Sequence, residues 1–149
     1  TIMKRFEFKL DGVLQLRNQH ERTVIDKHAV ALNRFNQLAE KMKTLREGLT
    51  MQQQRYQQSL SQPQSVSMMQ NLRKGCEYYE QRIDETLHAL NNAEQDLEQC
   101  KNALTAARQE CEVMEKYRDR LAGAHAKIID KADQTFLDEL SLRGAHQFS

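Results

Sequence analysis

The chain has 149 residues, of which 39% are hydrophobic and 29% are charged, with one Pro, five Gly and no Trp. This composition is too polar for a compact globule with a large core, and it offers too few turn residues for many strands or short helices. No run approaches the roughly 18 apolar residues of a membrane-spanning helix, and the first residues lead into no apolar signal region. We therefore expect a soluble cytoplasmic protein without membrane insertion.

The net charge of +1 conceals an uneven distribution along the chain. Residues 1–60 hold 11 Lys and Arg against 6 Asp and Glu, a net charge of +5, whereas residues 61–149 hold 11 against 15, a net charge of −4. Two halves of opposite sign attract each other when they are folded together. The formal neutrality therefore gives no indication of a nucleic-acid partner.

The first expected element is a long helix over about residues 9–60. A series of positions that starts at Leu10 and advances alternately by four and by three residues has the spacing of a narrow coiled-coil seam. Most of these positions are apolar, and the polar ones are Arg17, Glu21, His28 and Gln52. The predicted seam residues are Leu10, Leu14, Arg17, Glu21, Val24, His28, Ala31, Phe35, Leu38, Met42, Leu45, Leu49, Gln52 and Tyr56.

A loop over residues 61–66 is expected next, because it contains the only Pro of the chain and is rich in Ser. Pro63 lacks a backbone N–H donor and disfavours helix at Gln62, and Ser65 or Ser67 can cap the following helix. A connection of about six residues makes the flanking helices antiparallel neighbours.

The second helix is expected over about residues 67–141, with a seam of the same spacing. All three cysteines fall on this seam, form an odd set and have no CxxC spacing, so they indicate small buried residues in a reducing compartment, not a zinc site or a disulfide framework. The seam residues are Met69, Leu72, Cys76, Tyr79, Ile83, Thr86, Leu90, Ala93, Leu97, Cys100, Leu104, Ala107, Cys111, Met114, Arg118, Leu121, His125, Ile128 and Ala132.

These elements predict an all-α fold: two long helices in one antiparallel coiled-coil hairpin over residues 1–149, with the second helix longer and overhanging at the C-terminus. Folding at the loop pairs residues whose numbers sum to roughly 129, which places Arg17 near Glu112 and Glu21 near Arg108. Phe6 then lies near Gly123.

The overhang beyond Gly123 is not polar, and apolar residues on a lone helix indicate a partner surface. A frayed tail and a contact between two copies of the chain are the alternatives. The apolar residues of the overhang are Ile128, Ile129, Phe136, Leu137, Leu140 and Leu142.

Sequence signals of catalysis are missing. Neither a GxxxxGK[ST] phosphate loop nor a GxGxxG motif is present, and His20-Glu21 begins like a zinc-protease motif but has Val24 in place of the second His. A two-helix hairpin also offers little concavity for a substrate. We expect no enzyme activity, no cofactor and no metal.

A basic run in the first helix contains Lys41, Lys43 and Arg46, with Arg34 and Arg55 nearby. Acidic residues interrupt this run, and it lacks the interleaved aromatic residues of nucleic-acid surfaces. A solvated face, or pairing with the acidic second helix, is the favoured interpretation over phosphate or lipid binding.

Both ends of the chain resemble those of one family. Residues 6–21, FEFKLDGVLQLRNQHE, and residues 133–140, DQTFLDEL, followed by Arg143, are similar to the terminal segments of the FliJ/YscO family of flagellar and type III secretion proteins. The length and the hairpin layout also match. The resemblance leaves flagellar, virulence-type and other export systems open.

The resemblance implies a stalk similar in shape to the central γ subunit of rotary ATPases. Such proteins insert paired terminal helices into a hexameric export ATPase, contact the cytoplasmic domain of the export gate and have secretion chaperones as further partners, at the periphery of the inner-membrane export apparatus. Ala107 and Arg108 resemble the exporter-facing stretch. The residues expected at the ATPase-facing end are Phe6, Phe8, Leu10, Leu14, Arg17, Ile128, Phe136, Leu137 and Leu140.

A different class of function competes with this one. A holdase-type chaperone or a generic coiled-coil adaptor would bind its clients through the apolar tail, and a rod that binds RNA or membranes would need a free basic face on the first helix.

Overall fold

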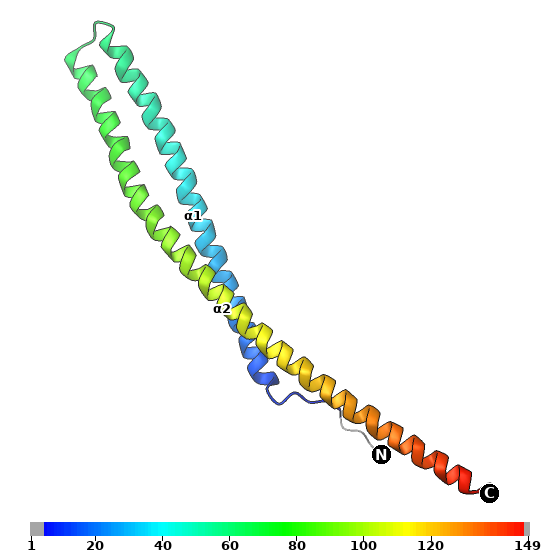
Figure 1. The fold of residues 1–149 in the computed structure, drawn as a ribbon. Coiled ribbons are helices and arrows are strands. Elements are labelled where there is room, and N and C mark those ends of the chain that lie inside the picture. Colours follow the sequence, from blue (N-terminus) through cyan, green and yellow to red (C-terminus); the bar gives the residue numbers. More distant parts are fainter. Residues whose placement is uncertain (1–4, 148–149) are drawn as a thin grey trace. The chain divides into compact units, whose positions relative to one another are not determined.

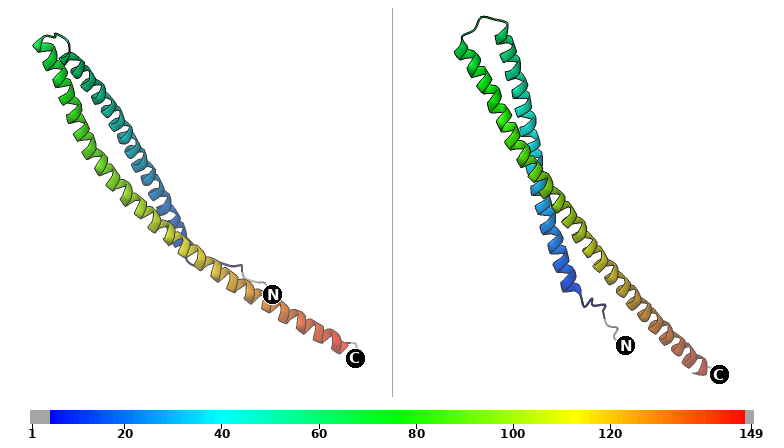
Figure 2. Two further views of the ribbon diagram at one scale, coloured as in Figure 1. Left: turned by 45° about the horizontal axis from the view of Figure 1, so that its top comes forward. Right: turned by 60° about the vertical axis from the view of Figure 1, so that its left-hand side comes forward.

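The computed structural model describes residues 5–147, which form the helices α1 (Asp11–Leu60) and α2 (Val66–Gln147) joined by a loop over residues 61–65. The helices run in opposite directions from this loop (Figures 1 and 2), which confirms the all-α antiparallel hairpin with the longer second helix. The second helix extends past its expected end near residue 141.

The contacts along the chain divide it into two units. The first, called the terminal unit below, contains the residues up to Arg22 and those from Thr105 onward; the second, called the loop unit, contains Thr23–Leu104. The expected organisation as a single domain stays a prediction.

Ser65 lies directly before Val66 and caps α2, a role that was expected of either Ser65 or Ser67. Its side-chain oxygen accepts a hydrogen bond from the backbone N–H of Met68 at 3.1 Å, and its carbonyl oxygen accepts one from the N–H of Met69 at 3.1 Å. These bonds satisfy donors that the first turn of a helix leaves without a partner. Because Pro63 precedes this cap, the chain reverses direction within five residues.

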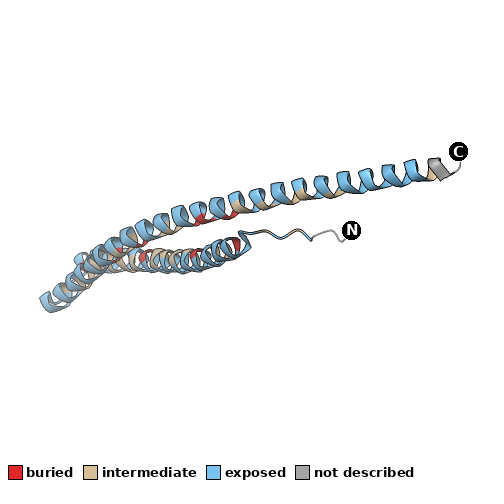
Figure 3. Cartoon of the chain, turned by 90° about the horizontal axis from the view of Figure 1, so that it is seen from below, coloured by how far each residue is buried: buried red, intermediate tan, exposed pale blue. Residues whose placement is uncertain are grey.

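Every predicted seam position of the loop unit is buried or half-buried, so the alternating steps of four and three are confirmed there. Only a narrow strip of each helix is buried, and most of the surface of both helices is exposed (Figure 3). The most deeply buried seam residues of this unit are Val24, Met42, Thr86, Ala93 and Leu104.

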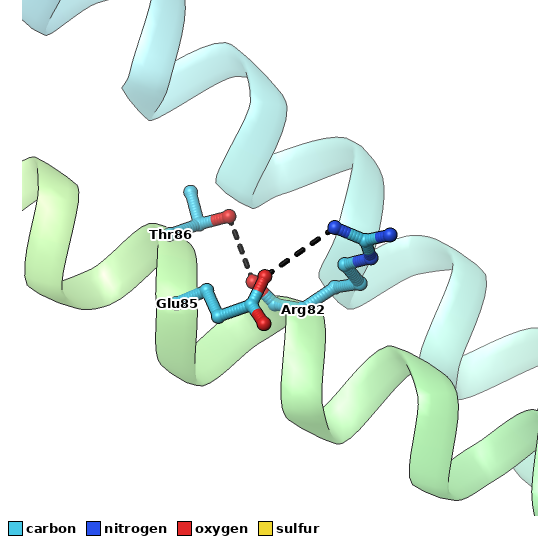
Figure 4. A network of polar contacts seen from close by, with 3 residues as sticks. All are labelled: Arg82, Glu85 and Thr86. Atoms are coloured by element: carbon cyan, nitrogen blue, oxygen red, sulfur yellow. Dashed lines mark hydrogen bonds and ion pairs between the residues drawn. The ribbon is translucent and has the colours of Figure 1, made fainter.

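Thr86 shows how this seam accommodates a polar residue. Its side chain is buried, and its hydroxyl donates a hydrogen bond of 2.7 Å to the carbonyl oxygen of Arg82, one turn earlier in α2 (Figure 4). Arg82 in turn forms an exposed ion pair with Glu85 at 3.4 Å. The hydroxyl therefore enters the seam without an unsatisfied donor.

Two glycines allow the helices of the loop unit to approach closely. The ring of Tyr79 on α2 occupies the place of a side chain at Gly48 on α1, and the side chain of Gln52 on α1 occupies the equivalent place at Gly75 on α2. The Gln52 amide also donates a hydrogen bond of 3.4 Å to the carbonyl oxygen of Leu72. Each helix therefore contributes one large residue and one glycine, and this reciprocal packing fixes the alignment of the two helices.

Candidate functional site

The seam of the terminal unit begins with a cluster of buried residues from both helices. Leu14, Ala107 and Cys111 are each at most 3% exposed. Beside them, Arg17 forms an ion pair of 3.0 Å with Glu110, and both side chains are about half exposed. Such a pair contributes roughly 0.2 to 1 kcal/mol, so its main effect is on alignment.

The expected pairing of Arg17 with Glu112 is wrong by two residues. Glu112 instead forms an ion pair with Lys116 at 3.0 Å along α2. Because α2 begins at Val66, directly after the loop, the paired residue numbers of Arg17 and Glu110 sum to 127, not 129. Glu21, which was expected near Arg108, interacts with Cys111.

The Cys111 thiol has an unusual electrostatic environment. Burial raises its pKa to about 11, and a hydrogen bond to Glu21 and the negative charges of Glu21, Glu115 and Glu110 act in the same direction. The three cysteines are free, and Cys76 and Cys100 are only half-buried. The pKa of Cys111 in the folded chain lies above its ordinary value of 9.0. The protonated thiol therefore contributes fully to the stability of the fold below pH 9, and this contribution is lost as the pH rises toward 11.

We expect iodoacetamide at pH 8 to alkylate Cys111 at least about tenfold more slowly than Cys76 and Cys100, because alkylation requires an accessible thiolate. Mass spectrometry of peptides sampled over time measures the three rates. The change Glu21→Gln removes one cause of the raised pKa and speeds the reaction at Cys111 only. Equal rates at all three thiols of the folded chain would contradict this assignment.

The N-terminal strap, residues 5–10, covers part of α2 in the terminal unit. It is not helical, and its residues alternate between exposed and half-buried from Arg5 to Lys9, as in an extended segment with one face on a surface. The ring of Phe6 lies 5.7 Å from that of His125, and the ring of Phe8 lies 6.1 Å from that of Tyr117, edge to face. Both Phe side chains therefore contact α2, close to the expected position at Gly123.

Between the strap and α2 lies an open groove, called the terminal groove below. Its apolar floor is only partly covered, since Leu10 is 39% exposed and Ile128 is 67% exposed. Ile128 also lines the next groove along α2, with Ala132 and Phe136, so the apolar surface continues toward the C-terminus. The residues that line the terminal groove are Arg5, Phe6, Glu7, Phe8, Lys9, Leu10, Tyr117, Leu121, Ala124, His125 and Ile128.

The predicted seam of α2 agrees with the structure only in part after Arg118, where His125 is half-buried as expected. Leu121, Ile128 and Ala132 are exposed, whereas Ala122 and Ile129 are half-buried in their place. The reason is a change of partner, because α1 begins only at Asp11 and the strap that faces this part of α2 is not a helix. An extended segment imposes no heptad spacing on the helix that it contacts.

The apolar tail, residues 130–143 of α2, is exposed at every residue, as Figure 3 shows. Phe136, Leu137 and Leu140 are between 46% and 60% exposed. Leu140 follows Phe136 by four residues and Leu137 by three, so the three side chains lie on one face of the helix. Leu142, which is 64% exposed, lies on another face.

The other candidate residues have contrasting environments. Ala107 is buried in the seam at 2% exposure, whereas the neighbouring Arg108 is exposed. The sequence interpretation missed Tyr117 as the contact of Phe8. The signal for it was the alternation Phe6-Glu7-Phe8, which places two rings on the same side of an extended segment.

Residues 5–147 contain no group of three or more His, Cys, Asp or Glu side chains placed to hold a metal ion. Neither helix, over the part that the structure describes, has a stretch apolar enough to cross a membrane.

These features define a coiled-coil hairpin protein with an exposed apolar surface at its terminal end. A family model described as "Flagellar FliJ protein" matches residues 6–147, nearly the whole chain. The chain belongs to the FliJ family, whose members are components of the flagellar export apparatus. Comparisons with curated proteins and with solved structures gave no match.

Proposed function

We propose that the chain is a coupling component of the flagellar export apparatus, and that its apolar tail binds the hexameric export ATPase. The observation that supports this is the exposure of Phe136, Leu137 and Leu140 on one helix face, beside the partly covered Ile128. Exposed aromatic and aliphatic side chains that adjoin in this way are typical of a surface that a partner covers.

The terminal unit supplies the parts of a γ-like stalk end. The buried Leu14 and the Arg17–Glu110 ion pair hold α1 against α2, and Phe6, Phe8 and Leu10 add the strap to the same surface. The tail and the strap then enter the ring of the ATPase together, where they promote hexamer assembly or couple ATP turnover to export. No active site in this chain is needed, because the partner hydrolyses the nucleotide.

Contacts with the cytoplasmic domain of the export gate, and with secretion chaperones, belong to the same proposal. Because Ala107 is buried, the exposed Arg108 is the residue of this pair that can reach the gate. These contacts place the chain at the periphery of the inner-membrane export apparatus.

The deciding experiment mixes the chain with the export ATPase and compares the full length with a version that ends at Gly123. We expect the full chain to increase hexamer formation and ATP hydrolysis, and the shortened version to increase neither. Sedimentation velocity and phosphate release measure the two quantities. If the full chain has no effect on either, the stalk function is wrong, and retained binding of unfolded clients would then favour a holdase-type chaperone.

A further inference from the structure

Four of the six cations of α1 in the loop unit lie on one side of the hairpin. Lys27, Arg34, Lys41 and Arg55, called the basic edge below, each precede a seam residue by one position, and all four are exposed. In a coiled coil, residues that precede seam positions lie on one side of the helix pair, and residues that follow them lie on the other. The basic edge therefore runs along one side of the loop unit.

The carboxylates of this unit are sorted differently. Between residues 23 and 60, no Asp or Glu precedes a seam position of α1. On α2, five acidic residues of the loop unit follow seam positions and so face the other side: Glu77, Glu80, Asp84, Glu94 and Glu98. The two acidic residues of α2 that do face the basic edge are Glu85, which forms an ion pair with Arg82, and Asp96.

Of the two interpretations of the basic run, the structure supports the solvated face, because Lys43 and Arg46 also form no ion pair with the second helix among the described residues. Among the ion pairs of residues 5–147, none involves Lys27, Arg34, Lys41 or Arg55. The four cations outnumber the two acidic residues of α2 on this side, and such an excess of like charge produces a positive potential that selects a partner of opposite sign.

An apolar groove adjoins this row of charges. Val30, which also precedes a seam position, is 70% exposed at its rim, and the small side chains of Ala31 and Ala93 leave space beside it. Cys100 lines the same groove, together with Asp26 and Asp96. An apolar side chain of a partner can enter here while its acidic neighbours reach the basic edge.

We propose that the basic edge binds an acidic amphipathic helix of a partner protein, which packs along the loop unit as a third helix. Lys27, Arg34 and Lys41 recur every seven residues, about 10.5 Å apart along the axis, which matches carboxylates at the same heptad spacing on a helix. On α1, the outward residues between the cations, such as Gln37 and Thr44, include no aromatic side chain on which nucleic-acid bases stack. The exposed Tyr78 of α2 lies on the same side, but the guanidinium of Arg82 lies over its ring at 5.2 Å. This surface is separate from the apolar tail and does not depend on the ATPase contact.

The test uses a fluorescein-labelled synthetic helix of about four heptads, with Leu on one face and Glu at the flanking positions, where mutual repulsion disfavours its self-pairing. Two full-length double variants are compared. Arg34→Glu/Lys41→Glu changes the charge of the basic edge, and Lys43→Glu/Arg46→Glu makes the same change in net charge on the opposite side of α1. We expect the first variant to weaken binding about tenfold or more and the second less than about twofold. Val30→Ser, tested alone, weakens binding about threefold through lost apolar contact.

Circular dichroism of each variant establishes that its helix content is unchanged. Equal weakening by the two charge variants would show unspecific attraction and overturn the proposal. A single-stranded RNA oligonucleotide and phosphatidylglycerol vesicles serve as competing probes. If either binds more tightly than the acidic helix and loses affinity on Arg34→Glu/Lys41→Glu, the edge is a nucleic-acid or membrane surface instead, and the third-helix assignment is wrong.

Discussion

Replacing Phe136, Leu137 and Leu140 together by Ala is expected to weaken binding of the export ATPase by about 100-fold. Large apolar residues at the centre of an interface each contribute on the order of 2 kcal/mol or more, and their contributions are not additive. The helix itself is expected to persist, because all three side chains are exposed and Ala has the highest helix propensity. Titration of the labelled chain with the ATPase, followed by fluorescence anisotropy, measures the affinity.

Leu142→Ala is the matched control for the tail. Leu142 is more exposed than the three contact residues but lies on another face of α2, so its loss is expected to change the affinity less than about threefold. Urea unfolding of both variants establishes that stability is unchanged. An ATPase affinity that survives the triple substitution would remove the tail from the interface and leave the strap and the terminal groove as the contact.

Gly48→Leu is expected to destabilise the chain by up to about 2 kcal/mol, although Leu is the better helix former. A side chain at Gly48 would collide with the ring of Tyr79, which must then leave the seam. Forcing extra atoms into a packed contact costs about 1 to 3 kcal/mol, more than the gain of up to about 1 kcal/mol in helix propensity. The midpoint of urea unfolding, monitored by circular dichroism, measures the change.

Gly123→Leu provides the control of opposite sign. Apart from the adjacent residues and backbone of α2, no atom lies within 4 Å of the place that a Cβ atom at Gly123 would occupy, so the substitution is expected to stabilise α2 by up to about 1 kcal/mol. Tyr79→Ala, combined with Gly48→Leu, should relieve the collision and give a coupling free energy of about 0.5 to 3 kcal/mol. Additive effects of the two substitutions would show that Tyr79 and Gly48 are not in contact.

The candidate site was predictable only in part, for physical reasons that particular residues illustrate. Phe136, Leu137 and Leu140 were identifiable because an amphipathic stripe beyond the paired region has no partner within the hairpin. Phe8 was identifiable as a terminal residue, but its contact with Tyr117 was not, because an extended strap has no period that fixes its position on a helix. Ala107 was assigned to a surface although its position on the seam already predicted its burial.

The two helices, the loop, a serine cap on the second helix and the seam of the loop unit were predictable from the order of the residues. These features depend on short-range chemistry and on the repeating steps of four and three, both of which are written in the order of the residues. The tertiary structure decided how the helices align. Arg17 pairs with Glu110 and the cations of the basic edge form no ion pair, because alignment depends on the loop and on the close packing at Gly48 and Gly75.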